Sequence, residues 1–139
     1  MAIGTIKVRP TGATATIART GHPEVSSVTG GALTVVTRPS EPGFNPLDLL
    51  YASLSACLAL SARIAASELG VIDRFEGARA TVTGDKAAEE PARVERLRIE
   101  FAIDGDFDPA AKAAIIERAE RICTVSNTLK TAPEFVVNS

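Results

Sequence analysis

The stretch NPLDLLYASLSACLALSARIAASELG, from Asn45 to Gly70, decides the fold. Asn45 is a favourable N-cap residue, and Pro46 suits the first helical position because it needs no N–H partner there. Gly70 is a typical residue for ending a helix. We therefore predict a helix over residues 46–68, a rod about 35 Å long at ~1.5 Å per residue.

This helix has no polar face. Its only charged residues are Asp48, Arg63 and Glu68, and apolar or small residues occupy the other positions. A helix that is apolar on every side is buried on every side. We expect a long, buried central helix that needs more cover than the rest of a 139-residue chain readily gives.

The remaining segments predict strands on both sides of this helix and a second helix near the end. Residues 97–103 alternate apolar and charged side chains, the pattern of a half-buried strand. Asp108 and Pro109 begin a helix that extends to about Ile122, and Ser126 begins one further helical turn. The order indicates a single α+β domain over residues 1–139. The expected strands cover residues 5–8, 13–18, 32–37, 78–83, 97–103 and 135–137.

Composition argues against several classes of partner. Fifteen basic and seventeen acidic side chains leave a net charge of −2, and they are interspersed, so neither nucleic acid nor an anionic membrane is expected. No charged segment followed by an apolar one opens the chain, so we expect a cytoplasmic protein. The apolar run Leu49–Ala62 stops at Arg63, short of the ~20 residues of a membrane span.

Few residues are suited to chemistry. The chain has two cysteines and one histidine, with no spacing typical of a zinc site and no glycine-rich phosphate loop. A Ser-His-Asp arrangement would have to use His22, which is expected in a loop. Cys57 and Cys123 remain: in the cytosol a cysteine pair that forms a disulfide is usually catalytic or sensory. The alternative is two inert buried thiols, and a separation of this size along the chain cannot show whether they meet.

Two motifs resemble those of the osmotically inducible protein C (OsmC) family, which includes the organic hydroperoxide resistance proteins. The first is Asn45-Pro46-Leu47-Asp48-Leu49-Leu50-Tyr51-Ala52-Ser53-Leu54-Ser55-Ala56-Cys57. The second, Cys123-Thr124-Val125-Ser126-Asn127-Thr128-Leu129, is similar to the family pattern Cys-Pro-Val-Ser-Asn-x-Leu, with Thr124 in place of proline. The order of elements is also similar, so the resemblance covers nearly the whole chain.

The resemblance implies a thiol peroxidase that defends against oxidative stress. Cys57 would attack the O–O bond of an organic hydroperoxide as a thiolate, and Cys123 would condense with the resulting sulfenic acid to form a disulfide. An external dithiol, in some members a lipoylated protein, would reduce it. No metal, flavin or other cofactor is implied. The fold implied is an intertwined homodimer, in which antiparallel strands of both subunits wrap the paired central helices.

The resemblance also implies an arginine, held by a glutamate, that activates the thiol. Arg19 is the better candidate here, and Arg38 is the other. Leu47 occupies the position of the usual glutamate, and Asp48 follows it. Nine residues of helix place Asp48 on the opposite side from Cys57 and about 13 Å away along the axis. It could serve the site of another subunit, or it could only stabilise the first turn of the helix.

The helix residues near Cys57 predict the substrate class. Leu50, Ser53, Leu54, Leu60 and Ser61 offer apolar contact and little hydrogen bonding, which favours alkyl or aryl hydroperoxides over hydrogen peroxide. Two other classes stay open: a non-catalytic redox sensor or binder of a small apolar ligand, and a structural domain with inert cysteines.

Overall fold

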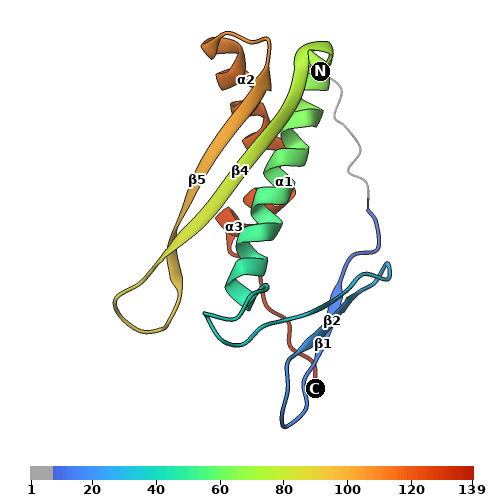
Figure 1. Ribbon diagram of the computed structural model, residues 1–139, viewed down its shortest axis with the longest axis vertical. Coiled ribbons are helices and arrows are strands. Elements are labelled where there is room, and N and C mark those ends of the chain that lie inside the picture. Colours follow the sequence, from blue (N-terminus) through green and yellow to red (C-terminus); the bar gives the residue numbers. More distant parts are fainter. Residues whose placement is uncertain (1–7) are drawn as a thin grey trace. The chain divides into compact units, whose positions relative to one another are not determined.

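The computed structural model describes residues 8–139. The chain divides into two compact units, with the boundary in the sequence between Leu49 and Leu50. The N-terminal unit contains an antiparallel sheet of three strands, β1 (Ala13–Thr16), β2 (Glu24–Ser27) and β3 (Ala32–Thr34), in the order β1-β2-β3 (Figure 1). β1 and β3 confirm the predicted strands 13–18 and 32–37, although both are shorter. β2 was not predicted, because Pro23 and two serines give it a weak strand signal. The predicted strand 5–8 lies outside the described residues except for Val8, which is not in a strand.

The long helix α1 spans Pro46–Glu68, as predicted. At its end the N–H of Gly70 donates to the carbonyl of Ser67 at 3.0 Å, and the N–H of Val71 donates to the carbonyl of Ala66 at 2.8 Å. This pair of bonds is the Schellman arrangement, which needs a left-handed residue after the last turn. Gly70 supplies that conformation with φ 74°, so the expected stop is confirmed.

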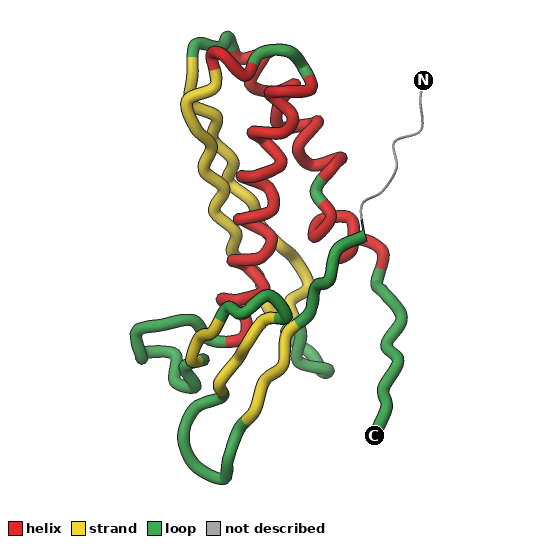
Figure 2. The backbone as a smooth tube through the Cα atoms, turned by 90° about the vertical axis from the view of Figure 1, so that its right-hand side faces the viewer, coloured by secondary structure: helices red, strands yellow, loops and turns green. Residues whose placement is uncertain are grey.

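The C-terminal unit continues with a short 3-10 turn, η1 (Ile72–Arg74), and a long hairpin of β4 (Phe75–Lys86) and β5 (Val94–Gly105). Both predicted strands of this region are confirmed, and both are longer than predicted. Helices α2 (Pro109–Ile122) and α3 (Thr124–Thr131) follow. α1 and α2 lie on the same side of the hairpin (Figures 1 and 2). The result is the expected mixture of antiparallel strands and a central helix.

Two apolar clusters hold this unit together. One joins the end of α1 to the hairpin and α2 through Ala62, Ile103 and Ile115. The other joins the middle of α1 to β4 and to the start of α3 through Leu58, Val82 and Cys123. The second predicted cysteine is therefore part of the core.

One chain covers only one face of α1. Leu54 and Leu58 are buried, whereas Leu60 and Ile64 are 50% and 44% exposed. The burial on every side that the sequence predicts is therefore not seen within the C-terminal unit. By length and composition α1 is also large enough to cross a membrane, so the argument from the shorter run Leu49–Ala62 is wrong. Core helices of soluble proteins reach the same size, and one face of α1 packs into the two apolar clusters.

Two predictions at the C-terminal end are wrong. Residues Phe135–Val137 form no strand and are exposed, because no strand edge among residues 8–139 pairs with them. The last helical turn begins at Thr124 rather than Ser126, because Cys123 takes the N-cap position that was assigned to Ser126.

Candidate functional site: a cysteine pair between α1 and α3

Cys57 and Cys123 meet within the C-terminal unit. Cys57 lies in the middle of α1 and is half-buried, and Cys123 lies between α2 and α3 and is 0% exposed. Cys57 packs against the apolar cluster that contains Cys123, and it lies close enough to raise the pKa of the Cys123 thiol. Both cysteines are free, so the structure contains a reduced pair in contact.

The turn between α2 and α3 places Cys123. Its backbone is extended, with φ −71° and ψ 110°, so it ends α2 and begins α3. Its Sγ accepts the backbone N–H of Ser126 at 3.4 Å and caps the new helix. The Asn127 side-chain amide donates to the carbonyl of Arg121 at 3.1 Å and ties the two helices together.

Thr124, the departure from the family motif, is the first residue of α3. Its carbonyl accepts the hydroxyl of Thr128 at 2.8 Å. Proline is common at this position because its fixed φ suits a helix and its missing N–H has no partner within the helix. Threonine adopts the same backbone, so the substitution leaves the placement of Cys123 intact.

The surroundings keep Cys123 protonated. Burial raises the pKa of Cys123, the hydrogen bond with Cys57 and the Cys57 charge raise it further, and the backbone N–H groups of Ser126 and Val125 lower it.

A mostly apolar cavity of about 200 Å³ lies next to the apolar cluster that holds the two cysteines. It shares Leu54 and Leu97 with the cluster that holds both cysteines. Among the helix residues predicted to surround a substrate, Leu54 lines this cavity. Ser61 is buried, and Ser53 and Leu60 are exposed. The cavity is lined by Leu54, Leu97, Ile99, Ser126, Leu129 and Lys130.

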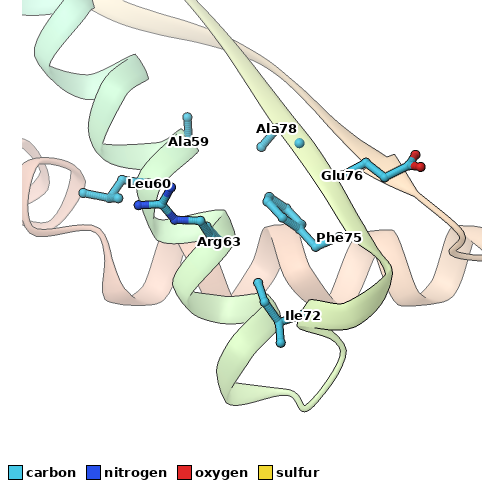
Figure 3. A pocket seen from close by; sticks show the side chains of 8 residues that line it. Ala59, Leu60, Arg63, Ile72, Phe75, Glu76 and Ala78 are labelled. Atoms are coloured by element: carbon cyan, nitrogen blue, oxygen red, sulfur yellow. The ribbon is translucent and has the colours of Figure 1, made fainter.

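A larger hollow, of about 580 Å³, lies between α1 and β4 and contains no cysteine. Arg63 and Leu60 of α1 line one side, Phe75 and Ala78 line the other, and Glu76 points away from it (Figure 3). Its size alone does not make it the reactive site. Neither cavity is lined by a cysteine, but the smaller one shares residues with the cluster that holds both thiols.

The two candidate arginines belong to the N-terminal unit. Arg19 follows β1 in a bend, Arg38 follows β3, and both are exposed. Their role toward Cys57 stays a prediction.

Asp48 and Asn45 cap the start of α1. The N–H of Asp48 donates to Asn45 Oδ1 at 2.8 Å, and the N–H of Asn45 donates to Asp48 Oδ2 at 3.1 Å. This reciprocal pair is a capping box. α1 is continuous from Pro46 to Glu68, so it keeps Asp48 about 13 Å along the axis from Cys57 of the same chain.

His22 lies in a loop, as expected, and its Nε2 lies 2.8 Å from Glu41 Oε2. The hydrogen bond from His22 lowers the pKa of Glu41. This pair was not predicted, because its members are far apart in the sequence and follow no motif. Among residues 8–139, no group of His, Cys, Asp and Glu is arranged to hold a metal ion.

The fold and the site together define a small α+β protein with a reduced cysteine pair in contact. The chain belongs to the OsmC-like protein family, whose sequence model matches residues 39–138. No curated protein matches the chain significantly.

Solved structures of OsmC-like and organic hydroperoxide resistance proteins share the fold. An OsmC-like protein from Mycoplasma pneumoniae is 19% identical, with a TM-score of 0.77 over 89% of each chain. An organic hydroperoxide resistance protein from Elizabethkingia anophelis is 22% identical, with a TM-score of 0.69 over 92% of this chain and 93% of its own. An organic hydroperoxide resistance protein OsmC from Legionella pneumophila is 20% identical, with a TM-score of 0.66 over 91% and 93%.

Proposed function

We propose that this protein reduces organic hydroperoxides to alcohols through a disulfide between Cys57 and Cys123. The observation that carries the proposal is the contact between the half-buried Cys57 and the fully buried Cys123. A reactive thiol needs access to its substrate, and a resolving thiol needs only access to the first. The exposure of the two cysteines suits these roles in that order.

The first step oxidises Cys57. Its thiolate attacks the outer oxygen of R–O–OH, the O–O bond breaks, and the alkoxide takes a proton and leaves as an alcohol. Cys57 is left as a sulfenic acid. The neighbouring Cys123 thiol then attacks that sulfur, water leaves, and the disulfide forms. A sulfenic acid with a thiol in contact is protected from irreversible oxidation.

Completing the cycle requires an external dithiol, which gives two electrons to the disulfide and becomes a disulfide itself. We propose a dithiol carrier of the lipoyl type as this partner. Arg19 is our candidate for the cation that stabilises the Cys57 thiolate, with Arg38 as the alternative.

Turnover with site variants tests the function. Wild type should consume an aryl hydroperoxide in the presence of excess dithiol, and Cys57→Ser should not. Cys123→Ser should perform the first oxidation and then stop as a sulfenic acid that a dimedone-type probe captures. Capture of a sulfenic acid on Cys123 in the Cys57→Ser variant would reverse the roles.

We further propose that the protein acts as a homodimer, with the exposed face of α1 covered by a second copy. Leu60 and Ile64 lie on that face, and Ile72 is exposed beside it. An obligate interface of this kind buries about 2,000 Å² or more. Light scattering at micromolar concentration should give the mass of two chains. A monodisperse monomer would contradict the proposal.

A second candidate is a redox sensor or apolar-ligand binder without turnover. Leu47 occupies the position of the family's usual glutamate and favours this second candidate. An arginine near Cys57 would lack the glutamate carboxylate that holds it. A protein whose thiols oxidise with hydroperoxide but that shows no dithiol-dependent turnover would support this reading.

A further inference from the structure

We propose that the external reductant attacks the sulfur of Cys57, and that Cys123 is the leaving group, received by the N-terminal amides of α3. This inference rests on the proposed disulfide cycle and adds which sulfur is attacked and what stabilises the one that leaves. It predicts that the mixed disulfide between the protein and the reductant forms on Cys57 of α1.

Access supports this direction. Cys123 is 0% exposed, whereas Cys57 is half-buried and keeps part of its surface accessible. A thiolate attacks a disulfide along the line of the S–S bond, from the side opposite the leaving sulfur. Attack on Cys57 can therefore come from outside the cluster, but attack on Cys123 would have to come through its core.

The leaving sulfur has a prepared environment. Cys123 Sγ accepts the N–H of Ser126 at 3.4 Å, and the backbone N–H of Val125 also lowers the pKa of Cys123. Both amides lie in the first turn of α3, at its positive end. A sulfur that is stabilised as a thiolate leaves faster in thiol–disulfide exchange. Burial still raises the pKa of Cys123, and the two amides offset part of that increase. Once the reductant is attached to Cys57, the Cys57 charge no longer adds to it.

The exchange balances in two steps. The first thiolate of the dithiol attacks Cys57 Sγ, the Cys57–Cys123 bond breaks, and its electron pair goes to Cys123 Sγ, which then takes a proton. The second thiol of the reductant loses its proton and attacks the mixed disulfide. The Cys57 thiolate is released, and the reductant leaves as a disulfide with two electrons transferred in all.

Trapping tests the direction of attack. The disulfide is first formed with diamide, without any peroxide, so a failure of the peroxidase proposal does not affect this test. Oxidised wild type is mixed with excess glutathione and quenched in denaturant with N-ethylmaleimide. Peptide mapping should show glutathione on Cys57 and maleimide on Cys123. Glutathione on Cys123, or equal amounts on both, would overturn the inference.

A second test removes one amide from the leaving group. Val125→Pro deletes an N–H that lowers the pKa of Cys123, at a first-turn position where proline is tolerated. Val125→Ala keeps the N–H and loses most of the side chain, and Thr124→Pro deletes an amide for which no contact with the sulfur is seen. Reduction of the diamide-formed disulfide by dithiothreitol should slow about tenfold in Val125→Pro, the scale of one charge-assisted hydrogen bond. The other two variants should stay within about twofold of wild type. Equal rates in Val125→Pro and Val125→Ala would exclude the amide as a stabilising group.

Discussion

Asn45 and Asp48 exchange two hydrogen bonds, of 2.8 and 3.1 Å, at the start of the helix that carries Cys57. Each residue satisfies a backbone N–H that would otherwise lack a partner in the first turn. Asp48 therefore has a structural role that is independent of any part in the reaction.

Substitution of the two residues separates these roles. Asn45→Ala and Asp48→Ala should each lower the free energy of unfolding by about 1 kcal/mol, measured by urea denaturation. The capping account predicts that both variants keep the same hydroperoxide turnover below their melting temperatures. A loss of turnover in Asp48→Ala alone would assign the carboxylate to the reaction.

Gly84 in β4 leaves room for Tyr51 of α1. A Cβ at Gly84 would lie 2.5 Å from Tyr51 Oη and 2.8 Å from Val94 Cγ1, so both neighbours would have to move. We expect Gly84→Ala to destabilise the protein by about 1–3 kcal/mol, as overpacking does. Gly77→Ala, in the same strand, is the control, because its Cβ would only reach ordinary contact with Asp104 Oδ2 at 3.8 Å. Equal melting temperatures for the two variants would contradict this packing.

The raised pKa of Cys123 predicts how stability depends on pH. The unfolded thiol loses its proton near its ordinary pKa, about 8.5, whereas the folded thiol holds it to higher pH. The stabilisation that Cys123 contributes is therefore complete below the ordinary thiol pKa. The free energy of unfolding then falls as the pH rises above that value. Urea denaturation measures the free energy of unfolding of reduced wild type and reduced Cys123→Ser at each pH. The range from pH 7 to 10 extends about one unit or more on each side of the ordinary thiol pKa. A steeper fall in Cys123→Ser than in wild type would contradict the assignment.

The sequence predicted those features that depend on residues close together in the chain, such as helix ends. Asn45, Pro46 and Gly70 fix the bounds of α1, and those bounds match the structure. The contact between Cys57 and Cys123 was implied only by the family motifs, because packing across the unit brings two distant segments together. The final strand at Phe135–Val137 was predicted from composition, but a strand forms only where an edge is free to pair with it.

The cavity that shares Leu54 and Leu97 with the cysteine cluster predicts a preference for bulky peroxides. An aryl hydroperoxide should have a higher kcat/KM than hydrogen peroxide, because each buried methylene contributes about 0.8 kcal/mol. Leu129 is 38% exposed, and Leu129→Ala enlarges this cavity. The substitution should lower the ratio of kcat/KM for the aryl hydroperoxide to kcat/KM for hydrogen peroxide a few-fold. Leu69→Ala is the matched control, since Leu69 is 42% exposed and does not line the cavity. The same kcat/KM for both peroxides in wild type would exclude an apolar substrate site.

Single-turnover oxidation of the reduced protein tests the central claim most directly. One equivalent of an aryl hydroperoxide per chain, without reductant, should yield one equivalent of the alcohol. Both titratable thiols should disappear, and peptide mapping should find one disulfide that joins Cys57 to Cys123. Two thiols that stay titratable while the hydroperoxide is unchanged would contradict the account.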